Sequence, residues 1–174
     1  MKKIVKAVAL VAAMAFTGMA AAQVTIPNTS LSLSISNETW RYLRTFKLDD
    51  GADIYLYYYI GHDVVDADGD TVLPYLRIYV NTNYDGDLYS LVYDRYMLQP
   101  YQSLNEYTHG LGLPAAGGLG YDAVYTSPGD GKDYRFLMTY FKDRKAYVEI
   151  RLETTSDTFG EMEFEFKDLL GTLK

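Results

Sequence analysis

Cysteine is absent from the 174-residue chain, which excludes disulfide bonds, thiol catalysis, thiolate metal sites and lipid attachment at a cysteine. Only two histidines are present, so a histidine-rich metal centre is not expected. Basic residues are outnumbered, because 16 Lys and Arg face 23 Asp and Glu, for a net charge of −7. A chain of this sign is repelled by phosphate backbones and anionic lipids. We therefore expect no nucleic-acid partner.

Residues 1–22 have the pattern of a secretory signal peptide. A basic start precedes an apolar run over residues 7–16, and three alanines supply an Ala-x-Ala cleavage site before Gln23. The apolar run is shorter than the roughly 20 residues that span a bilayer, so we expect no stable membrane insertion after cleavage. The leader is bacterial in style and predicts a periplasmic or secreted protein. Residues 23–174 then suit one domain.

Turns rich in glycine and aspartate divide the mature chain into short apolar or alternating runs. In the last of these runs, apolar side chains alternate with polar ones such as Glu149 and Arg151, which predicts a half-buried antiparallel strand. The predicted strands are residues 31–36, 40–48, 52–60, 74–80, 121–126, 134–141 and 145–153.

Helical periodicity occurs in the middle of the chain and at its end. Residues 87–98 predict one helix, residues 102–109 a second, and residues 111–120 a glycine-rich loop. Thr158 and Glu161 have the spacing of a capping box for a closing helix. The apolar stripe of that helix is Phe159, Met162, Phe166, Leu169, Leu170 and Leu173. An antiparallel β-sheet with helices packed on it predicts the α+β class, as an α/β/α sandwich.

Several segments carry a family resemblance. The first predicted strand runs into Trp40 (SLSISNETW), residues 102–114 read QSLNEYTHGLGLP, the last two strands read GKDYRFLMTYFKDRKAYVEIRLET, and the chain closes on FKDLLGTLK. This order resembles the fold of PsbP, a lumenal subunit of the photosystem II oxygen-evolving complex, and of the Ran-binding protein Mog. The resemblance implies a PsbP/Mog-like domain and a non-catalytic adaptor or accessory role. It identifies no catalytic residue and no partner.

Tyrosine is abundant, with 18 residues in the chain. Alternation places Tyr55, Tyr57 and Tyr59 on one face of a predicted strand, and Tyr75 and Tyr79 on one face of another. Tyrosine offers a large contact area with a polar tip, which suits a protein partner, a small ligand or a glycan. These five residues are the candidate binding face. The alternative is ordinary strand packing beneath a helix.

Residues 66–70 place Asp66, Asp68 and Asp70 at alternate positions, as a calcium loop does. The sixth and twelfth positions of such a loop would need Gly and Glu, but they hold Thr71 and Arg77. We therefore interpret the segment as a solvated acidic hairpin loop and expect no metal site and no cofactor.

Catalytic signatures are missing from the sequence. There is no Gly-x-Ser-x-Gly motif, and the spacing of His62 and His109 brings them to no shared site. His62 beside Asp63 could form half of a metal or acid–base site, but two surface histidines are the simpler interpretation. We therefore expect an exported, non-catalytic accessory or protein-binding module and not an enzyme. The alternative is a periplasmic or secreted protein that binds a small ligand or glycan through its Tyr-rich face.

Overall fold

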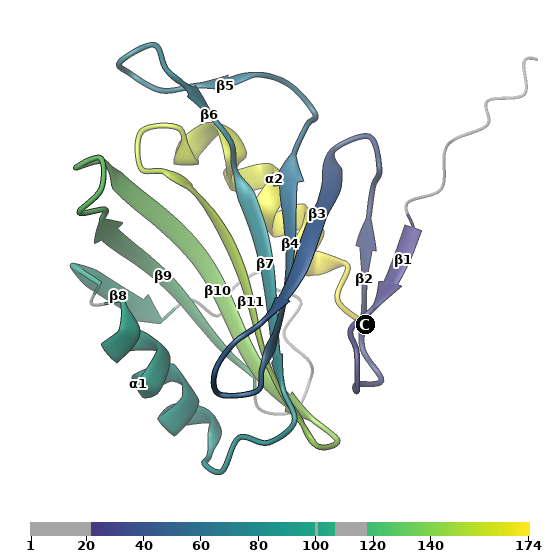
Figure 1. Ribbon diagram of the computed structural model, residues 1–174. Coiled ribbons are helices and arrows are strands. Elements are labelled where there is room, and N and C mark those ends of the chain that lie inside the picture. Colours follow the sequence, from purple (N-terminus) through teal and green to yellow (C-terminus); the bar gives the residue numbers. More distant parts are fainter. Residues whose placement is uncertain (1–21, 100, 107–117) are drawn as a thin grey trace, which may run out of the picture.

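The computed structural model describes residues 22–99, 101–106 and 118–174, and Figure 1 shows their arrangement. The strands are β1 (Ala22–Thr25), β2 (Ser32–Ile35), β3 (Trp40–Lys47), β4 (Asp53–Tyr59), β5 (Val64–Val65), β6 (Thr71–Val72), β7 (Tyr75–Asn81), β8 (Ser103–Glu106), β9 (Leu119–Thr126), β10 (Asp133–Asp143) and β11 (Ala146–Thr155). The helices are α1 (Leu88–Leu98) and α2 (Phe159–Gly171). Most of the predicted leader therefore lies outside the described residues.

A seven-stranded antiparallel sheet in the order β3-β4-β7-β11-β10-β9-β8 forms the body of the molecule. Tight turns join its longest strands. Gly51 turns β3 into β4 with φ 83°, and Arg144 turns β10 into β11 with φ 54°. Such left-handed conformations are easiest for glycine, which explains the glycine in the first turn. The predicted α+β class, with an antiparallel sheet and packed helices, is confirmed.

Each face of the sheet carries its own hydrophobic core. One core contains the apolar residues of α2 together with inward residues of β2, such as Leu33 and Ile35. The other contains Leu91 and Val92 of α1 with Phe136 and Met138 of β10. The two helices therefore cover opposite faces of the sheet (Figure 1).

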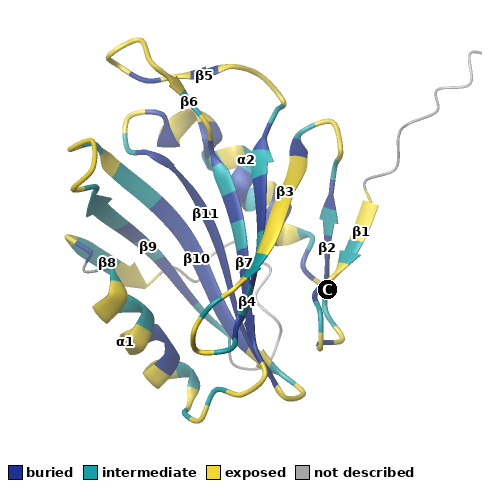
Figure 2. Cartoon of the chain, in the orientation of Figure 1, coloured by how far each residue is buried: buried dark blue, intermediate teal, exposed yellow. Residues whose placement is uncertain are grey.

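The predicted half-buried character of the last strand is wrong. Every residue of β11 is buried, including Glu149, Arg151 and Glu153, and the strand is dark blue throughout in Figure 2. Strand β11 lies in the interior of the sheet, between β7 and β10, and side chains of the α1 region cover the face that carries the charges. Alternation in the sequence marks two different faces, but it does not show that the polar face meets water.

The closing helix forms as predicted, with Phe159, Met162, Phe166, Leu169 and Leu170 buried. Its predicted capping box does not form. Thr158 is the N-cap but makes no side-chain cap bond, because its hydroxyl bonds to Thr154 and Thr155 instead. The Glu161 side chain reaches His62.

Residues 102–109 do not form the predicted helix over their described part. Residues 103–106 form the edge strand β8 and pair with β9, and His109 lies outside the described residues, as does most of the predicted loop 111–120. The first predicted strand forms as β2 but pairs with β1 in a separate two-stranded sheet. No helix among the described residues is long and apolar enough to cross a membrane.

Candidate functional site

The five candidate tyrosines lie on both faces of the sheet. Cross-strand pairing aligns Tyr55 with Ile78 and Tyr57 with Leu76, so these side chains face the α2 core, as does Tyr59. Tyr75 and Tyr79 alternate with those residues on β7 and face the α1 side. The five residues thus form two separate groups instead of one continuous surface.

Burial differs among these tyrosines. Tyr57, Tyr59 and Tyr79 are buried, whereas Tyr55 and Tyr75 are half-buried. Burial is the main cause that raises the pKa of Tyr57 and Tyr59, and it raises the pKa of Tyr79 to about 12. These three phenols therefore stay protonated at neutral pH and act as packing groups, and the hydroxyls of Tyr59 and Tyr79 also form hydrogen bonds.

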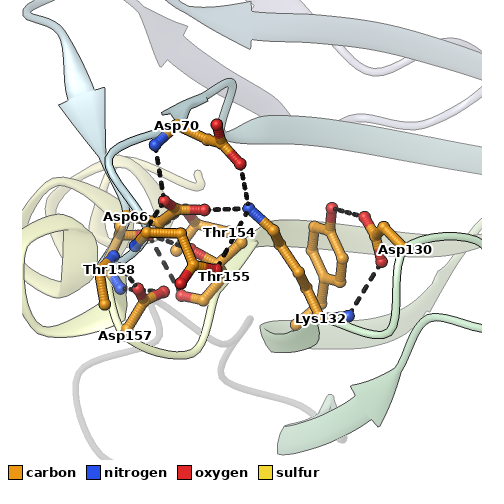
Figure 3. A network of polar contacts seen from close by, with 11 residues as sticks. Asp66, Asp70, Asp130, Lys132, Thr154, Thr155, Asp157 and Thr158 are labelled. Atoms are coloured by element: carbon orange, nitrogen blue, oxygen red, sulfur yellow. Dashed lines mark hydrogen bonds and ion pairs between the residues drawn. The ribbon is translucent and has the colours of Figure 1, made fainter.

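The acidic loop that joins β5 to β6 closes around a lysine from another part of the chain (Figure 3). The Lys132 ammonium contacts the Asp66 carboxylate, lies 2.9 Å from Asp70 Oδ2 and 4.0 Å from Asp68 Oδ2. Asp66 is buried, while Asp68 and Asp70 are exposed. The prediction of a solvated loop therefore fails for Asp66. Its hydrogen bond to Lys132 is the main cause that holds the pKa of the Asp66 carboxyl below its ordinary value.

The same region ties three parts of the chain together. Asp157 accepts hydrogen bonds from the backbone of Ala67 at 2.6 Å and of Thr158 at 3.0 Å, which joins the acidic loop to the start of α2. Asp130 accepts from the Lys132 backbone at 3.0 Å and from the Tyr134 hydroxyl at 2.9 Å, which orders the β9–β10 turn (Figure 3). The polar network therefore has a structural role, with its carboxylates already satisfied by protein donors.

We expect calcium to leave the melting temperature of this protein unchanged. The Lys132 ammonium already pairs with Asp66 and Asp70, and no cluster of three or more His, Cys, Asp or Glu with metal-site geometry occurs among the described residues. The test is thermal unfolding of chelator-treated protein across a calcium titration. The test is sensitive, because a ligand at a hundred times its dissociation constant adds about 2.7 kcal/mol. A shift that saturates at micromolar calcium would contradict the prediction.

His62 forms a short relay between two other side chains. Its Nδ1 lies 2.9 Å from the Tyr59 hydroxyl, and its Nε2 lies 2.6 Å from Glu161 Oε1. Gly61 permits this arrangement, since a Cβ atom there would collide with the Tyr59 ring. Tyr59 is buried against Trp40, so the relay fastens the end of β4 to the first turn of α2. Asp63, the neighbour suggested by the sequence, is not the partner in this relay.

A buried ionic network lies on the α1 face of the sheet, on β11 and β7. The Arg95 Nε of α1 donates to Glu149 Oε2 at 2.9 Å, and the guanidinium also lies over the Tyr79 ring at 4.6 Å. Glu149 is only 2% exposed. Burial acts to raise the pKa of Glu149, but the charges of Arg95 and Arg151 outweigh it and leave that pKa below its ordinary value.

Glu153 lies between Arg77 and Arg151 on the same face of the sheet. Arg77 Nη2 donates to Glu153 Oε1 at 2.6 Å, and Arg151 Nε lies 3.2 Å from Glu153 Oε2. Arg151 also donates to Gln99 Oε1 at 2.8 Å and to the Tyr101 hydroxyl at 3.3 Å. The strand register places Arg77 directly opposite Arg151, so this carboxylate separates two like charges. The network lies beside a cavity and holds its guanidinium groups in fixed positions.

Sequence reasoning missed this network. The alternating charges of β11 were visible, but the partners Arg77 and Arg95 come from distant segments, so only the strand order brings them together. The sequence of β7 carries a signal for this network, because polar and apolar residues alternate there as they do on β11 and Arg77 falls between Tyr75 and Tyr79.

Helix α1 carries large apolar side chains on both of its sides. Leu91 and Val92 are buried against the sheet, yet Tyr89, Tyr93 and Met97 are 66%, 62% and 60% exposed. These three residues follow one another at steps of four and therefore form a single row on the outer face of the helix. Leu98, next to Met97 at the end of the helix, is 74% exposed. Figure 2 shows exposed segments on this helix beside buried ones.

Comparison with known proteins gives no relative for this chain. No protein-family model matches it, and no curated protein matches its sequence. The PsbP/Mog-like resemblance stays a prediction, and function has to be inferred from the outer face of α1 and from the buried ionic network.

Proposed function

We propose that this chain is an exported, non-catalytic protein-binding module of PsbP/Mog-like architecture, which docks its partner on the outer face of α1. The docking surface is the row of Tyr89, Tyr93 and Met97, with the neighbouring Leu98. The single observation that carries the proposal is that each of these side chains is at least 60% exposed, on a helix whose other side is packed. Exposed apolar residues scattered singly are ordinary, but a contiguous row on one helix indicates an interaction site.

The composition of the row favours a protein partner. Tyrosine and methionine are enriched at the centre of protein interfaces, where tyrosine often supplies much of the binding energy. Acidic groups flank the row. Asp94 follows Tyr93 on the helix. At the other end of the row, Tyr89 and Glu106 of β8 both lie near Tyr121. The chain as a whole carries a charge of −7. The occupant is therefore a protein that presents an apolar centre with a basic rim, because such a rim complements this field.

The resemblance supports the same role. A sheet with one helix on each face, Trp40 after an early strand and a closing apolar helix fit the PsbP/Mog-like arrangement. Titratable groups of the described residues are mostly held in ion pairs and hydrogen bonds within the protein, which suits binding more than acid–base chemistry. A small ligand or glycan could instead bind at Tyr55 or at Tyr75, because each lines a cavity of its own on a different face of the sheet.

The test compares a double variant of the row with a matched variant elsewhere. Tyr93→Ala with Met97→Ala removes the centre of the row, and Phe164→Ala removes a large side chain that is 76% exposed on α2. The protein is used to isolate a stoichiometric partner from the exported fraction, and the purified pair is then titrated. We expect the double variant to weaken binding by at least about thirty-fold, since a tyrosine hot spot contributes 2 kcal/mol or more.

Two further measurements test whether the partner binds at the outer face of α1 and whether it carries a basic rim. Phe164→Ala should bind as the unchanged protein does, and added salt should weaken the complex, as expected for a basic rim meeting an acidic one. Equal binding by the double variant would overturn the proposal. A concentration-dependent dimer in sedimentation, lost in the double variant, would show that a second copy of this chain is the occupant and would also overturn it.

A further inference from the structure

A cavity of about 260 Å³ opens on the α1 face of the sheet, where the end of α1 meets β7, β10 and β11. Its polar wall is formed by Arg77, Arg151 and Glu153, with Gln99 from the end of α1. Its remaining wall includes the rings of Phe136 and of three tyrosines, which are Tyr75, Tyr125 and Tyr134. This cavity is separate from the docking surface, whose side chains point outward from α1.

The wall carries one positive charge in excess. Arg95 and Glu149 compensate each other behind the cavity, which leaves Glu153 as the one carboxylate between Arg77 and Arg151. Burial, which outweighs the attraction of Glu153, lowers the pKa of the Arg77 guanidinium. The Arg77 side chain is still 37% exposed, so its guanidinium can reach an anion that enters the cavity.

Donor atoms in the wall remain unused within the protein. Among the residues that the structure describes, three buried atoms of this wall have no hydrogen-bond partner, namely Arg77 Nε, Arg151 Nε and Glu153 Oε2. The Arg151 side chain is only 5% exposed, and its Nε lies 3.2 Å from Glu153 Oε2 without the geometry of a hydrogen bond. Buried polar atoms are almost always satisfied in folded proteins, so three unsatisfied atoms at one cavity, two of them guanidinium donors, need an explanation.

We propose that this cavity binds a small monocarboxylate with an aromatic or apolar body. Its carboxylate would accept hydrogen bonds from Arg77 and Arg151, since a guanidinium matches a carboxylate in both shape and charge. One excess positive charge beside Glu153 suits a group of charge −1, whereas a phosphate ester of charge near −2 would be repelled by that carboxylate. The ring of such a ligand would lie against Tyr125 and Phe136.

The size of the cavity limits the ligand. One water molecule occupies about 30 Å³ of liquid, so a cavity of about 260 Å³ corresponds to roughly nine waters. Benzoate, with nine non-hydrogen atoms, is the probe of matching size and charge. Benzamide has the same shape without the charge, and phenyl phosphate has the ring with a larger charge.

The experiment is a calorimetric titration of the mature protein, residues 23–174, with each of these three probes. We expect benzoate to bind saturably with a dissociation constant of about 1 mM or lower, and both other probes to bind at least tenfold more weakly. Arg77→Lys keeps the charge but loses the planar fork and should weaken benzoate at least tenfold. Arg135→Lys, on the α2 side, changes an arginine that is bound to Asp122 and should leave benzoate affinity unchanged.

A spectroscopic readout on the unchanged protein keeps the test valid if a variant does not fold. Benzoate should shift the nitrogen-15 and proton resonances of Arg77 Nε and Arg151 Nε, and should leave those of Arg135 Nε in place. Absence of saturable benzoate binding up to about ten times the expected dissociation constant would overturn the proposal. Equal affinity for benzamide, or shifts confined to residues outside this cavity, would also overturn it.

Discussion

Replacement of Phe166 by alanine is expected to lower the free energy of unfolding by about 3–5 kcal/mol. Phe166 lies in the middle of α2, is 0% exposed, and contacts Trp40 and Phe159 with ring centroids 6.2 and 6.0 Å away. Its removal leaves a cavity between the helix and the sheet that the surrounding rings cannot fill. The loss is a large part of the 5–15 kcal/mol that typically stabilises a domain.

Phe164 provides the matched control for this substitution. It belongs to the same helix and is the same residue type, but it is 76% exposed. Phe164→Ala should change the stability by less than about 0.5 kcal/mol, as surface substitutions generally do. Urea denaturation of both variants measures the difference. Equal and small effects would mean that α2 is not packed on the sheet in solution.

Replacement of Glu149 by glutamine is expected to cost about 3–5 kcal/mol at neutral pH. The substitution keeps the shape of the side chain but removes the charge that compensates Arg95 and Arg151, both of which lie largely out of solvent. An arginine left without its counter-charge in the interior carries the full cost of desolvation. Glu163→Gln is the control, because Glu163 pairs with Lys167 at 2.6 Å on the partly exposed side of α2. That change should cost about 0.3–0.5 kcal/mol.

The dependence on pH gives a second measure of the same carboxylate. The pKa of Glu149 is lower in the folded protein than its ordinary value of 4.5, so the unfolded chain takes up the proton first as the solution becomes more acidic. The stabilisation is therefore fully present above about pH 4.5 and is lost as the pH falls through the folded pKa. The difference between wild type and Glu149→Gln should shrink in that range. A difference that stays constant down to strong acid would contradict this assignment.

The elements predicted best are those whose apolar pattern has one interpretation. The stripe that contains Phe166 and Leu170 predicted α2 and its buried face, because steps of three and four fit only a helix. The hairpin of β10 and β11 corresponds to the adjacent predicted strands 134–141 and 145–153, with Arg144 at the turn between them. In both cases local spacing determines the structure, so the sequence carries the information.

The failures arise where distant segments decide the environment. Residues 103–106 were expected in a helix, but the free edge of β9 offers them backbone partners, and pairing overrides a weak helical period. The charges of β11 were expected to face water, but α1 covers them and supplies Arg95. The cavity at Arg77 and Arg151 depends on the order of β7 and β11 in the sheet, which no local spacing specifies. For the same reason the five tyrosines could not be assigned to faces from the sequence.

The two ends of the described chain meet at the β1–β2 hairpin, where Ser32 exchanges two backbone hydrogen bonds with Lys174. The Ser34 backbone also donates to the Thr172 hydroxyl, a contact that spans 138 residues. The core beneath α2 thus closes only when residues far apart in the sequence have met, because Leu33 and Ile35 share that core with Leu170. Such long-range closure carries a high entropic cost and slows folding. During synthesis, this side of the sheet therefore stays incompletely packed until the residues of α2 have been made.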